Sequence, residues 1–290
     1  MATLDDARGG AAPWLLSAPA LLLFVGMLLV PLLLTLVLSF HVFRDMAGVQ
    51  PDYTLHNYLL VVTDPYYGTI FLRTGVLAFA VTVLSIVLGV PETIVLARMR
   101  RPWQSICLLI VLGPLLISVV VRTLGWQILL GNNGVINDAL QALGITDEPI
   151  RFVFTMTGVV VALTHVLVPF MVMSVWATLQ KLDPQMEWAG RSLGASPLRV
   201  FRRVVLPQIL PGVLSGSIIV FALSASAFAT PALIGGRRLK VVATAAYDEF
   251  LGTLNWPLGA SIAVLLLIAN VAIVMGCSRL AERRFKHVFD

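Results

Sequence analysis

The chain has 290 residues, of which 58% are hydrophobic and only 12% are charged, and its mean hydropathy is +0.92. Soluble domains carry about twice that share of charged residues, so this composition excludes an ordinary soluble protein. The formal net charge of +5 does not require a nucleic-acid partner, because most Lys and Arg residues flank apolar segments.

Six segments without any Asp, Glu, Lys or Arg are each about as long as the roughly 20 helical residues that cross a hydrocarbon core. They predict helices over residues 14–40, 70–98, 103–126, 152–179, 209–234 and 258–281. The sequence therefore predicts an all-α integral membrane protein with six transmembrane helices. Residues 14–281 would form a single transmembrane domain, with short tails at 1–13 and 282–290.

Prolines interrupt most of these segments, among them Pro31, Pro114, Pro169 and Pro231. A proline inside a membrane helix frees a carbonyl and kinks the helix, so neighbouring helices have to satisfy the freed group. Kinked helices suit a pathway that alternates between open and closed states. The alternative is that proline is simply common in membrane helices, and the sequence leaves both interpretations open.

Ionisable side chains inside the segments are few, and such groups are functional candidates by default in a membrane. Glu92 follows a proline near the end of the second segment, and Arg122 lies near the end of the third. Both are close enough to an interface to reach water, so either could touch a solute or merely extend toward the headgroups. His165, in the middle of the fourth segment, is expected to be a packed, hydrogen-bonded histidine.

The loop between the fourth and fifth segments, residues 180–208, carries charges and turn signals and is expected to lie outside the lipid. Asp183, followed by a proline, predicts the start of a short helix, and Gly194 can take the left-handed conformation that ends one. Ser196, also followed by a proline, predicts a second helix, which Pro207 is expected to end. The loop thus reads as two short helices joined at a corner.

The residues around Glu187 favour a docking role for this loop. Ala189, Gly190 and Gly194 are small, which indicates that another surface approaches closely. The alternative is an ordinary basic loop, because the second predicted helix carries three arginines on one side.

A small, polar stretch near the end of the fifth segment is a candidate for lining a pathway. On one continuous helix, Ser224 and Phe228 would share a face, and Ser226 and Thr230 a neighbouring face. Hydroxyl groups beside one aromatic ring can hold an ammonium or a zwitterion. Small residues also permit close helix packing, and both interpretations stay open.

The distribution of Lys and Arg predicts the orientation, because these residues concentrate in cytoplasmic loops. The tails and the loops at residues 98–101 and 180–208 carry 13 of the 20 Lys and Arg residues, so both termini and the loop 180–208 are expected in the cytoplasm. A basic cluster at residues 237–240 on the opposite side weakens the bias. The opposite loops, about 41–69, 127–151 and 235–257, are too short for a soluble domain.

Signatures of catalysis and of metal binding are absent from the sequence. The three lysines, Lys181, Lys240 and Lys286, do not follow a glycine, so the chain has no phosphate-binding P-loop. No nucleophile elbow or HExxH pair occurs, and the two cysteines lack metal-ligand spacing. We therefore expect no enzyme activity, no catalytic residue, no metal and no cofactor on this chain.

The loop 180–208 resembles the EAA loop of permease subunits of bacterial ABC importers. That pattern has a glutamate followed by two alanines, a glycine at the corner, and a Leu-Pro pair before the next transmembrane helix. The matching residues are Glu187, Ala189, Gly194, Leu206 and Pro207. Trp188 stands where the middle alanine is usual. Stretches at 134–137, 167–172, 230–236 and 256–260 are similar to the first permease of spermidine/putrescine-type importers.

This resemblance implies a six-helix, MetI-like permease fold in the bacterial cytoplasmic (inner) membrane. It also implies a second permease subunit, two ATPase subunits that bind ATP and Mg²⁺, and an extracytoplasmic binding protein. The short loop helix would dock into the ATPase, and ATP-driven closure would turn the pathway outward. The residues expected to carry this coupling are Glu187, Ala189, Gly190, Gly194, Leu206 and Pro207.

The resemblance further implies that the solute is a polyamine or a related small amine. Polyamine carriers of the family often have an acidic residue just before the Phe-x-Thr-Pro stretch, and Ala227 occupies that position here. An amino acid derivative, an aminophosphonate or an iron carrier remains an alternative, as does an ion-coupled secondary transporter. The candidate pathway residues are Ser224, Ser226, Phe228, Thr230, Arg122 and Glu92.

Overall fold

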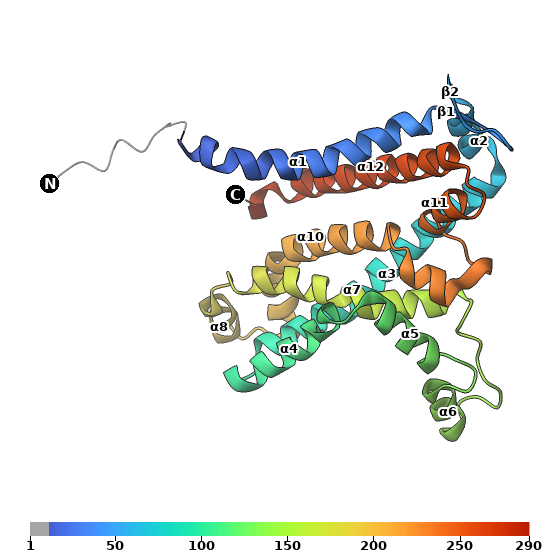
Figure 1. Ribbon diagram of the computed structural model, residues 1–290. Coiled ribbons are helices and arrows are strands. Elements are labelled where there is room, and N and C mark those ends of the chain that lie inside the picture. Colours follow the sequence, from blue (N-terminus) through green and yellow to red (C-terminus); the bar gives the residue numbers. More distant parts are fainter. Residues whose placement is uncertain (1–11, 290) are drawn as a thin grey trace.

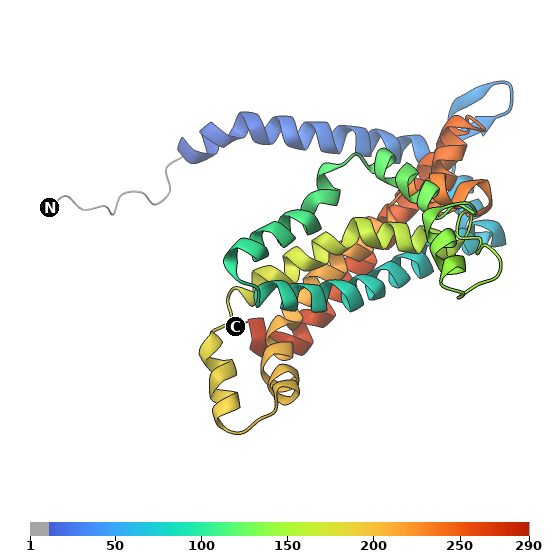
Figure 2. The ribbon, with the colours of Figure 1, turned by 90° about the horizontal axis from the view of Figure 1, so that it is seen from below.

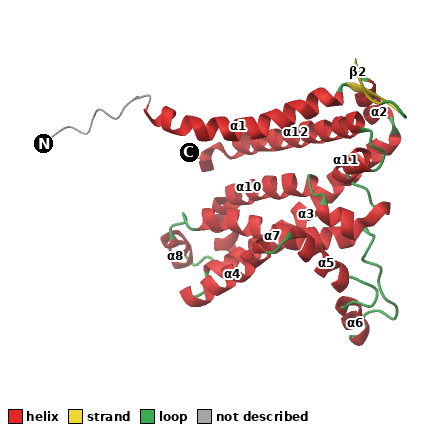
Figure 3. Ribbon diagram, in the orientation of Figure 1, coloured by secondary structure: helices red, strands yellow, loops and turns green. Residues whose placement is uncertain are grey.

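Long helices run side by side through the molecule, and shorter elements gather at its two ends (Figures 1 and 3). The computed structural model describes residues 12–289, with side chains described for 17–183 and 185–279. The elements in chain order are α1 (Ala12–Ser39), β1 (His41–Arg44), β2 (Gly48–Tyr53), α2 (His56–Thr63), α3 (Pro65–Ala97), α4 (Arg101–Leu116), α5 (Val119–Leu129), α6 (Val135–Ala142), α7 (Met156–Leu179), α8 (Pro184–Ser192), α9 (Pro197–Val200), the π-helix η1 (Phe201–Val205), α10 (Leu206–Ala225), the π-helix η2 (Pro231–Gly235), the 3₁₀-helix η3 (Gly236–Arg238), α11 (Val242–Leu251) and α12 (Trp256–Phe289).

The candidate membrane spans agree with the six-segment prediction. Five helices of the described chain are long and apolar enough to cross a membrane, and α4 with α5 makes a sixth if this bent pair is one span. Side-chain caps start two of them. Asp64 caps α3 by accepting a hydrogen bond from the Tyr66 amide, and Thr155 caps α7 through the Gly158 amide. Of the predicted tails, residues 1–11 and 290 lie outside the described residues, and the backbone of α12 continues as helix to Phe289.

The centre of the packing is α7, which lies between α3 and α10 (Figure 1). Of its most apolar 18-residue window, 67% is buried within the chain, a larger share than in any other candidate span of the described residues. Fully buried side chains join the three helices: Leu77 and Val81 from α3, Met171 from α7, and Ile209 from α10. This three-helix core holds the rest of the chain in place.

Gly212 brings α10 and α7 into backbone contact. A Cβ at this position would lie 2.4 Å from the Thr178 hydroxyl and 2.9 Å from the Ser174 carbonyl oxygen. The Ser174 hydroxyl donates a 2.8 Å hydrogen bond to the Gly212 carbonyl across the same contact. Small residues with hydroxyl partners are the usual way for membrane helices to pack this closely.

In contrast, α1 stands apart from this core. It lies beside α12 in Figure 1, but Figure 2 shows that it diverges from α12 and from the other long helices, and none of its most apolar window is buried within the chain. Its C-terminal end is anchored, because the Ser39 carbonyl accepts hydrogen bonds from the Asn57 amide at 3.0 Å and from the Ser261 hydroxyl at 3.1 Å. Most of the surface of α1 is therefore available to lipid or to another subunit.

The third span differs from its prediction, because residues 103–126 do not form one helix. α4 ends at Leu116 and α5 starts at Val119, and their axes differ by 101°. The bend follows Pro114, which cannot donate a backbone hydrogen bond and disturbs the turn that precedes it. The Arg122 guanidinium of α5 donates to the Pro114 carbonyl and braces the bend from the far side.

The helix that starts at Pro197 does not end at Pro207, so that prediction was wrong. α9, η1 and α10 form one continuous 29-residue helix, Pro197–Ala225. Within the π-turn of η1, the Leu206 amide bonds to the Phe201 carbonyl five residues back. A wider turn gives the Pro207 ring room beside the carbonyl that an α-helical turn would press against it. We call this 29-residue segment the long helix.

The loops opposite α8 contain more regular structure than was expected. They hold the β1–β2 hairpin and the short helices α2, α6 and α11. Two contacts fix α11 and the irregular segment that leads to it: the Val242 amide donates to Thr74 at 3.0 Å, and Lys240 pairs with Asp248 at 2.7 Å. The hydrogen bond to Asp248 raises the pKa of Lys240.

Candidate functional site

The corner formed by α8, Gly194 and α9 is built as the sequence predicts; we call residues 183–200 the α8 corner. The Asp183 carboxylate accepts a 2.9 Å hydrogen bond from the Gln185 amide and caps the start of α8. Gly194 has a φ of +77°, and the amides of Gly194 and Ala195 bond back to the last turn of α8. This pattern is a Schellman motif, which turns the chain sharply and favours glycine at this position.

Inside the corner, Gly190 serves the packing of α8 against α9. A Cβ at Gly190 would lie 3.2 Å from a methyl group of Val200, closer than side chains usually approach. Ala189, Trp188 and Leu193 are exposed; Trp188, at the rim of a pocket beside α8, is 67% exposed and Leu193 is 88% exposed. Two large apolar side chains on a polar segment outside the spans indicate a surface that another molecule covers.

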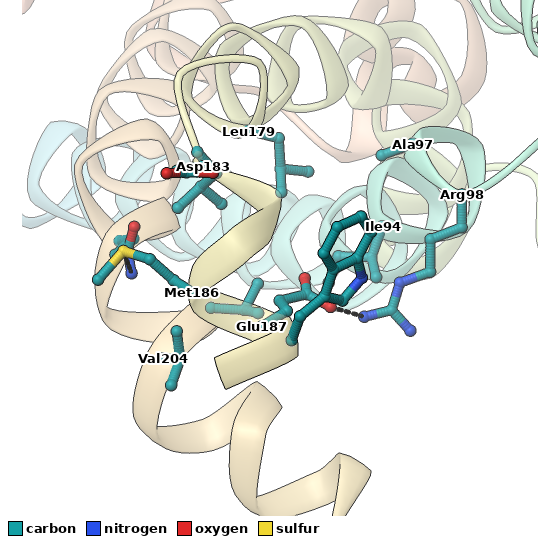
Figure 4. Close-up of a pocket in the computed structure, with 12 residues that line it drawn as sticks. Ile94, Ala97, Arg98, Leu179, Asp183, Met186, Glu187 and Val204 are labelled. Atoms are coloured by element: carbon teal, nitrogen blue, oxygen red, sulfur yellow. Dashed lines mark hydrogen bonds and ion pairs between the residues drawn. The ribbon is translucent and has the colours of Figure 1, made fainter. Parts of the chain in front are cut away.

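Glu187 forms two ion pairs within the chain. Its carboxylate lies 3.7 Å from the Arg98 guanidinium at the end of α3 (Figure 4) and 3.9 Å from Arg191 on its own helix. Beside it, a pocket of about 230 Å³ separates α8 from α3, α7 and the long helix. In Figure 2, α8 projects from the end of the helix bundle, so these weak contacts and the chain connections hold it.

Removing the Arg98 partner is expected to change little. All three side chains of this network are partly exposed, and such ion pairs stabilise by about 0.2–1 kcal/mol. We expect Arg98→Ala to leave membrane accumulation and uptake within about twofold of the unmodified protein. Glu187→Ala is expected to lower uptake much further, because the resemblance to the EAA loop implies that Glu187 carries the coupling to an ATPase subunit. If a Glu187→Arg, Arg98→Glu exchange restored uptake, the internal pair would be the functional contact instead.

Leu206 and Pro207 lie in the long helix, beyond the corner. Leu206 is the residue whose amide closes the π-turn, and Pro207 occupies the first turn of α10. Their position indicates that they shape the connection between the α8 corner and the span. A direct contact of either residue with a partner stays a prediction.

The four candidates near the end of the fifth segment do not share one helix. α10 ends at Ala225, so the face shared by Ser224 and Phe228 does not exist. Ser224 is buried and bonds to carbonyls of its own helix, while Ser226 is exposed. The chain needs a break here because a proline at 231 cannot donate to a helical carbonyl upstream.

Beyond this break, the remaining two candidates face different surroundings. Thr230 is buried, and its hydroxyl lies 3.2 Å from the Thr123 hydroxyl of α5. Phe228 is partly exposed, and its ring centroid lies 4.7 Å from that of Tyr247 on α11. Thr230 therefore joins the broken third span to the break in the fifth, and Ser226 and Phe228 are the two candidates a solute could reach.

A cavity of about 720 Å³ lies between α3, α4, α5 and α7, and sequence reasoning did not predict it. One face of α3, with residues four apart, contributes Leu84, Leu88 and Glu92. α4 contributes three further apolar residues, and α7 contributes His165 among apolar neighbours. The sequence shows that Glu92 follows two leucines at intervals of four residues, which places all three on one face of α3. It does not show the bend of the third span, which brings α4 and α5 to this face.

Trp126 joins α5 to this cavity through His165. Its indole nitrogen donates a 3.1 Å hydrogen bond to Nδ1 of His165, and the two rings lie 5.3 Å apart in an edge-to-face arrangement. An indole can only donate, so Nδ1 of His165 accepts and carries no proton. The expectation that His165 is hydrogen-bonded is confirmed, but its side chain is exposed instead of packed, because its ring lines a cavity.

Arg122 is buried and does not line this cavity. Its guanidinium donates to the Pro114 carbonyl, which also accepts a hydrogen bond from the Ile117 amide at the end of α4. A bracing role in the bent span explains this residue, and its contact with a solute stays a prediction. Among the described residues, no three His, Cys, Asp or Glu side chains come close enough to hold a metal ion.

Comparison with known proteins matches nearly the whole chain. A family model described as "Binding-protein-dependent transport system inner membrane component" matches residues 11–287. The "Spermidine/putrescine transport system permease protein PotB" of Escherichia coli K12 is 32% identical over 270 residues, covering 93% of this chain and 95% of that protein. The "Molybdenum transport system permease protein ModB" of Mycobacterium bovis is 35% identical over 216 residues, covering 74% of this chain and 80% of the relative.

Solved structures with the same fold are transporters. A bacterial alginate ABC transporter in complex with an alginate-bound periplasmic protein aligns with a TM-score of 0.78 at 16% identity, over 95% of this chain and 96% of that one. The methionine ABC transporter in inward-facing conformations aligns with a TM-score of 0.53 at 20% identity, over 74% of this chain and 93% of that one. At these identities the likeness establishes the fold alone.

Proposed function

Because the chain belongs to the family of binding-protein-dependent transport system inner membrane components, we propose that it forms half of the translocation pathway of an ATP-driven importer for polyamines. A second permease subunit would form the other half. Two ATPase subunits would bind ATP and Mg²⁺, and an extracytoplasmic protein would deliver the solute. The largely exposed α1 supports the second permease, because none of its most apolar window is buried within the described chain.

The α8 corner carries this proposal. It combines a helix that projects from the bundle, a left-handed glycine turn, and two exposed large apolar side chains outside the spans. A cleft in an ATPase subunit could cover Trp188 and Leu193 and pair with Glu187. Because the corner continues directly into the long helix, a movement of the ATPase would reach the spans without an intervening flexible joint.

The orientation of the chain follows from the same assignment. The α8 corner would face the cytoplasm of a bacterial cell, and both termini would lie on that side of the inner membrane. The concentration of Lys and Arg in the tails and in residues 180–208 supports this orientation.

A polyamine is the solute that we propose, on the strength of the relatives named for spermidine and putrescine. They align over more than nine-tenths of both chains, whereas the molybdenum permease aligns over about three quarters of this one. Polyamine carriers often have an acidic residue at the position of Ala227. Because alanine has no charge, other residues of this chain or of the second permease would have to bind the positively charged groups of the solute. No finding favours an ion-coupled secondary transporter.

Reconstitution tests the assignment. The purified chain alone is expected to hydrolyse no ATP above the level of a mock purification, because it has no P-loop. Together with the second permease, the ATPase subunits and the binding protein, it is expected to drive ATP-dependent uptake of labelled spermidine or putrescine into proteoliposomes. Uptake of an amino acid derivative, aminophosphonate or iron carrier in place of polyamines would contradict the solute assignment and leave the importer assignment standing.

A further inference from the structure

We propose that the cavity between α3, α4, α5 and α7 is where this subunit holds an ammonium group of the transported amine, with Glu92 as the counter-ion. The inference rests on the proposed function, because it names the place on this chain where an amine solute would bind. None of the candidate residues in the fifth span carries a negative charge, whereas Glu92 places a carboxylate in the cavity.

The carboxylate of Glu92 has no partner of its own. It lines the cavity in line with Leu84 and Leu88, and nothing in the described chain forms a hydrogen bond or an ion pair with it. A carboxylate inside a span is costly unless a cation or hydrogen-bond donors compensate it. An ammonium group that enters the cavity would supply both.

Trp126 and His165, which also line the cavity, would favour an ammonium group as well. The indole N–H of Trp126 is taken by His165, so the ring is fixed at the edge of the cavity, and indole rings attract cations through their faces. His165 accepts that hydrogen bond at Nδ1, so the imidazole is neutral and brings no competing positive charge. A carboxylate, an indole and a neutral imidazole in one cavity form a cation site that apolar walls surround.

The buried Arg122 does not neutralise Glu92. Arg122 is directed to the Pro114 carbonyl at the bend, and it forms no ion pair with Glu92 in the described chain. The volume of about 720 Å³ lies within the range of small-molecule sites, so the cavity has room for the chain of a polyamine as well as its charged end. The negative charge of Glu92, the aromatic ring of Trp126 and the volume of the cavity therefore favour one class of ligand, an alkyl ammonium.

The test uses the complete importer in proteoliposomes. Glu92→Gln keeps the size of the side chain and removes the charge, and it is expected to lower spermidine or putrescine uptake by roughly tenfold or more, the usual loss for a hydrogen bond to a charged group. Glu92→Asp keeps the charge and is expected to retain more uptake than Glu92→Gln. Glu148→Gln, the same change at an exposed loop position, is the matched control and is expected to transport normally.

A second measurement reads out binding without transport. A hydrophobic carbodiimide should modify the Glu92 carboxyl in the assembled complex, and mass spectrometry of the peptide quantifies the adduct. Spermidine is expected to protect Glu92, whereas NaCl at the same ionic strength is not, and the Glu92→Asp complex should show the same protection.

The outcomes separate the two proposals. An unmodified complex that imports no polyamine would overturn the proposed function. An unmodified complex that imports polyamine, while Glu92→Gln imports it at the same rate, would overturn this inference alone. Carbodiimide labelling of Glu92 that spermidine does not reduce would overturn it as well.

Discussion

Gly194→Val is expected to reduce solute uptake about 5- to 30-fold while the protein still accumulates in the membrane. Gly194 has a φ of +77°, and a residue with a Cβ costs about 1–2 kcal/mol in that conformation, which corresponds to the stated range. The Cβ itself would meet no atom of the chain within 4 Å, so the fold of the bundle is not at risk. Uptake by proteoliposomes and the amount of membrane-inserted protein are the two measurements.

Gly194→Asn is the matched control for this experiment. Asparagine is larger than glycine but tolerates the left-handed conformation, so we expect it to retain most of the uptake. If valine and asparagine lowered uptake equally, bulk at a docking surface would explain the loss. If valine left uptake unchanged, the conformation of the corner would have no part in transport.

Gly212→Val is expected to prevent accumulation of a folded protein, the largest structural effect of any single change considered. The new Cβ would overlap the Thr178 hydroxyl, which can rotate, and the Ser174 carbonyl, which cannot move without shifting α7. Overpacking of this kind costs about 1–3 kcal/mol or more, and here it falls on the contact that joins α7 to the long helix. Fluorescence-detected size-exclusion chromatography of detergent extracts would report the loss of the monodisperse peak.

Gly75→Ala provides the control for Gly212. It is also a helical glycine in a span, but a Cβ there would meet nothing within 4 Å, so the variant should accumulate at least as well as the unmodified chain. A folded, monodisperse Gly212→Val protein would show that α7 and α10 can separate without loss of the core, contrary to this account of their contact.

Much of the fold could be predicted because membrane spans and corners have local signals. Apolar runs long enough to cross a bilayer located the spans, and Asp183 and Gly194 bounded α8 through their own chemistry. These features depend on a few neighbouring residues, so a single sequence is sufficient to find them.

The breaks could not be predicted because the same residue has different effects in different surroundings. Pro114 precedes a 101° bend that Arg122 braces, whereas Pro207 lies inside a continuous helix because η1 widens the turn before it. Ser224 to Thr230 is apolar enough to continue a span, and hydropathy does not record where the helix stops. The cavity is lined by both arms of the bent third span, so it could not be predicted without the bend.

The length of the long helix determines how far a rotation at one end would displace the other end. Its 29 residues extend about 44 Å at 1.5 Å per residue, so a rotation of about 5° around the end at Pro197 displaces the end at Ala225 by about 4 Å, close to the width of an alkyl chain. The backbone contact at Gly212 ties this helix to α7, which supplies the wall of the cavity that holds His165. The same rotation would displace Gly212, about 23 Å from Pro197, by about 2 Å, so a small torque at the α8 corner would move α7 at the wall of the cavity.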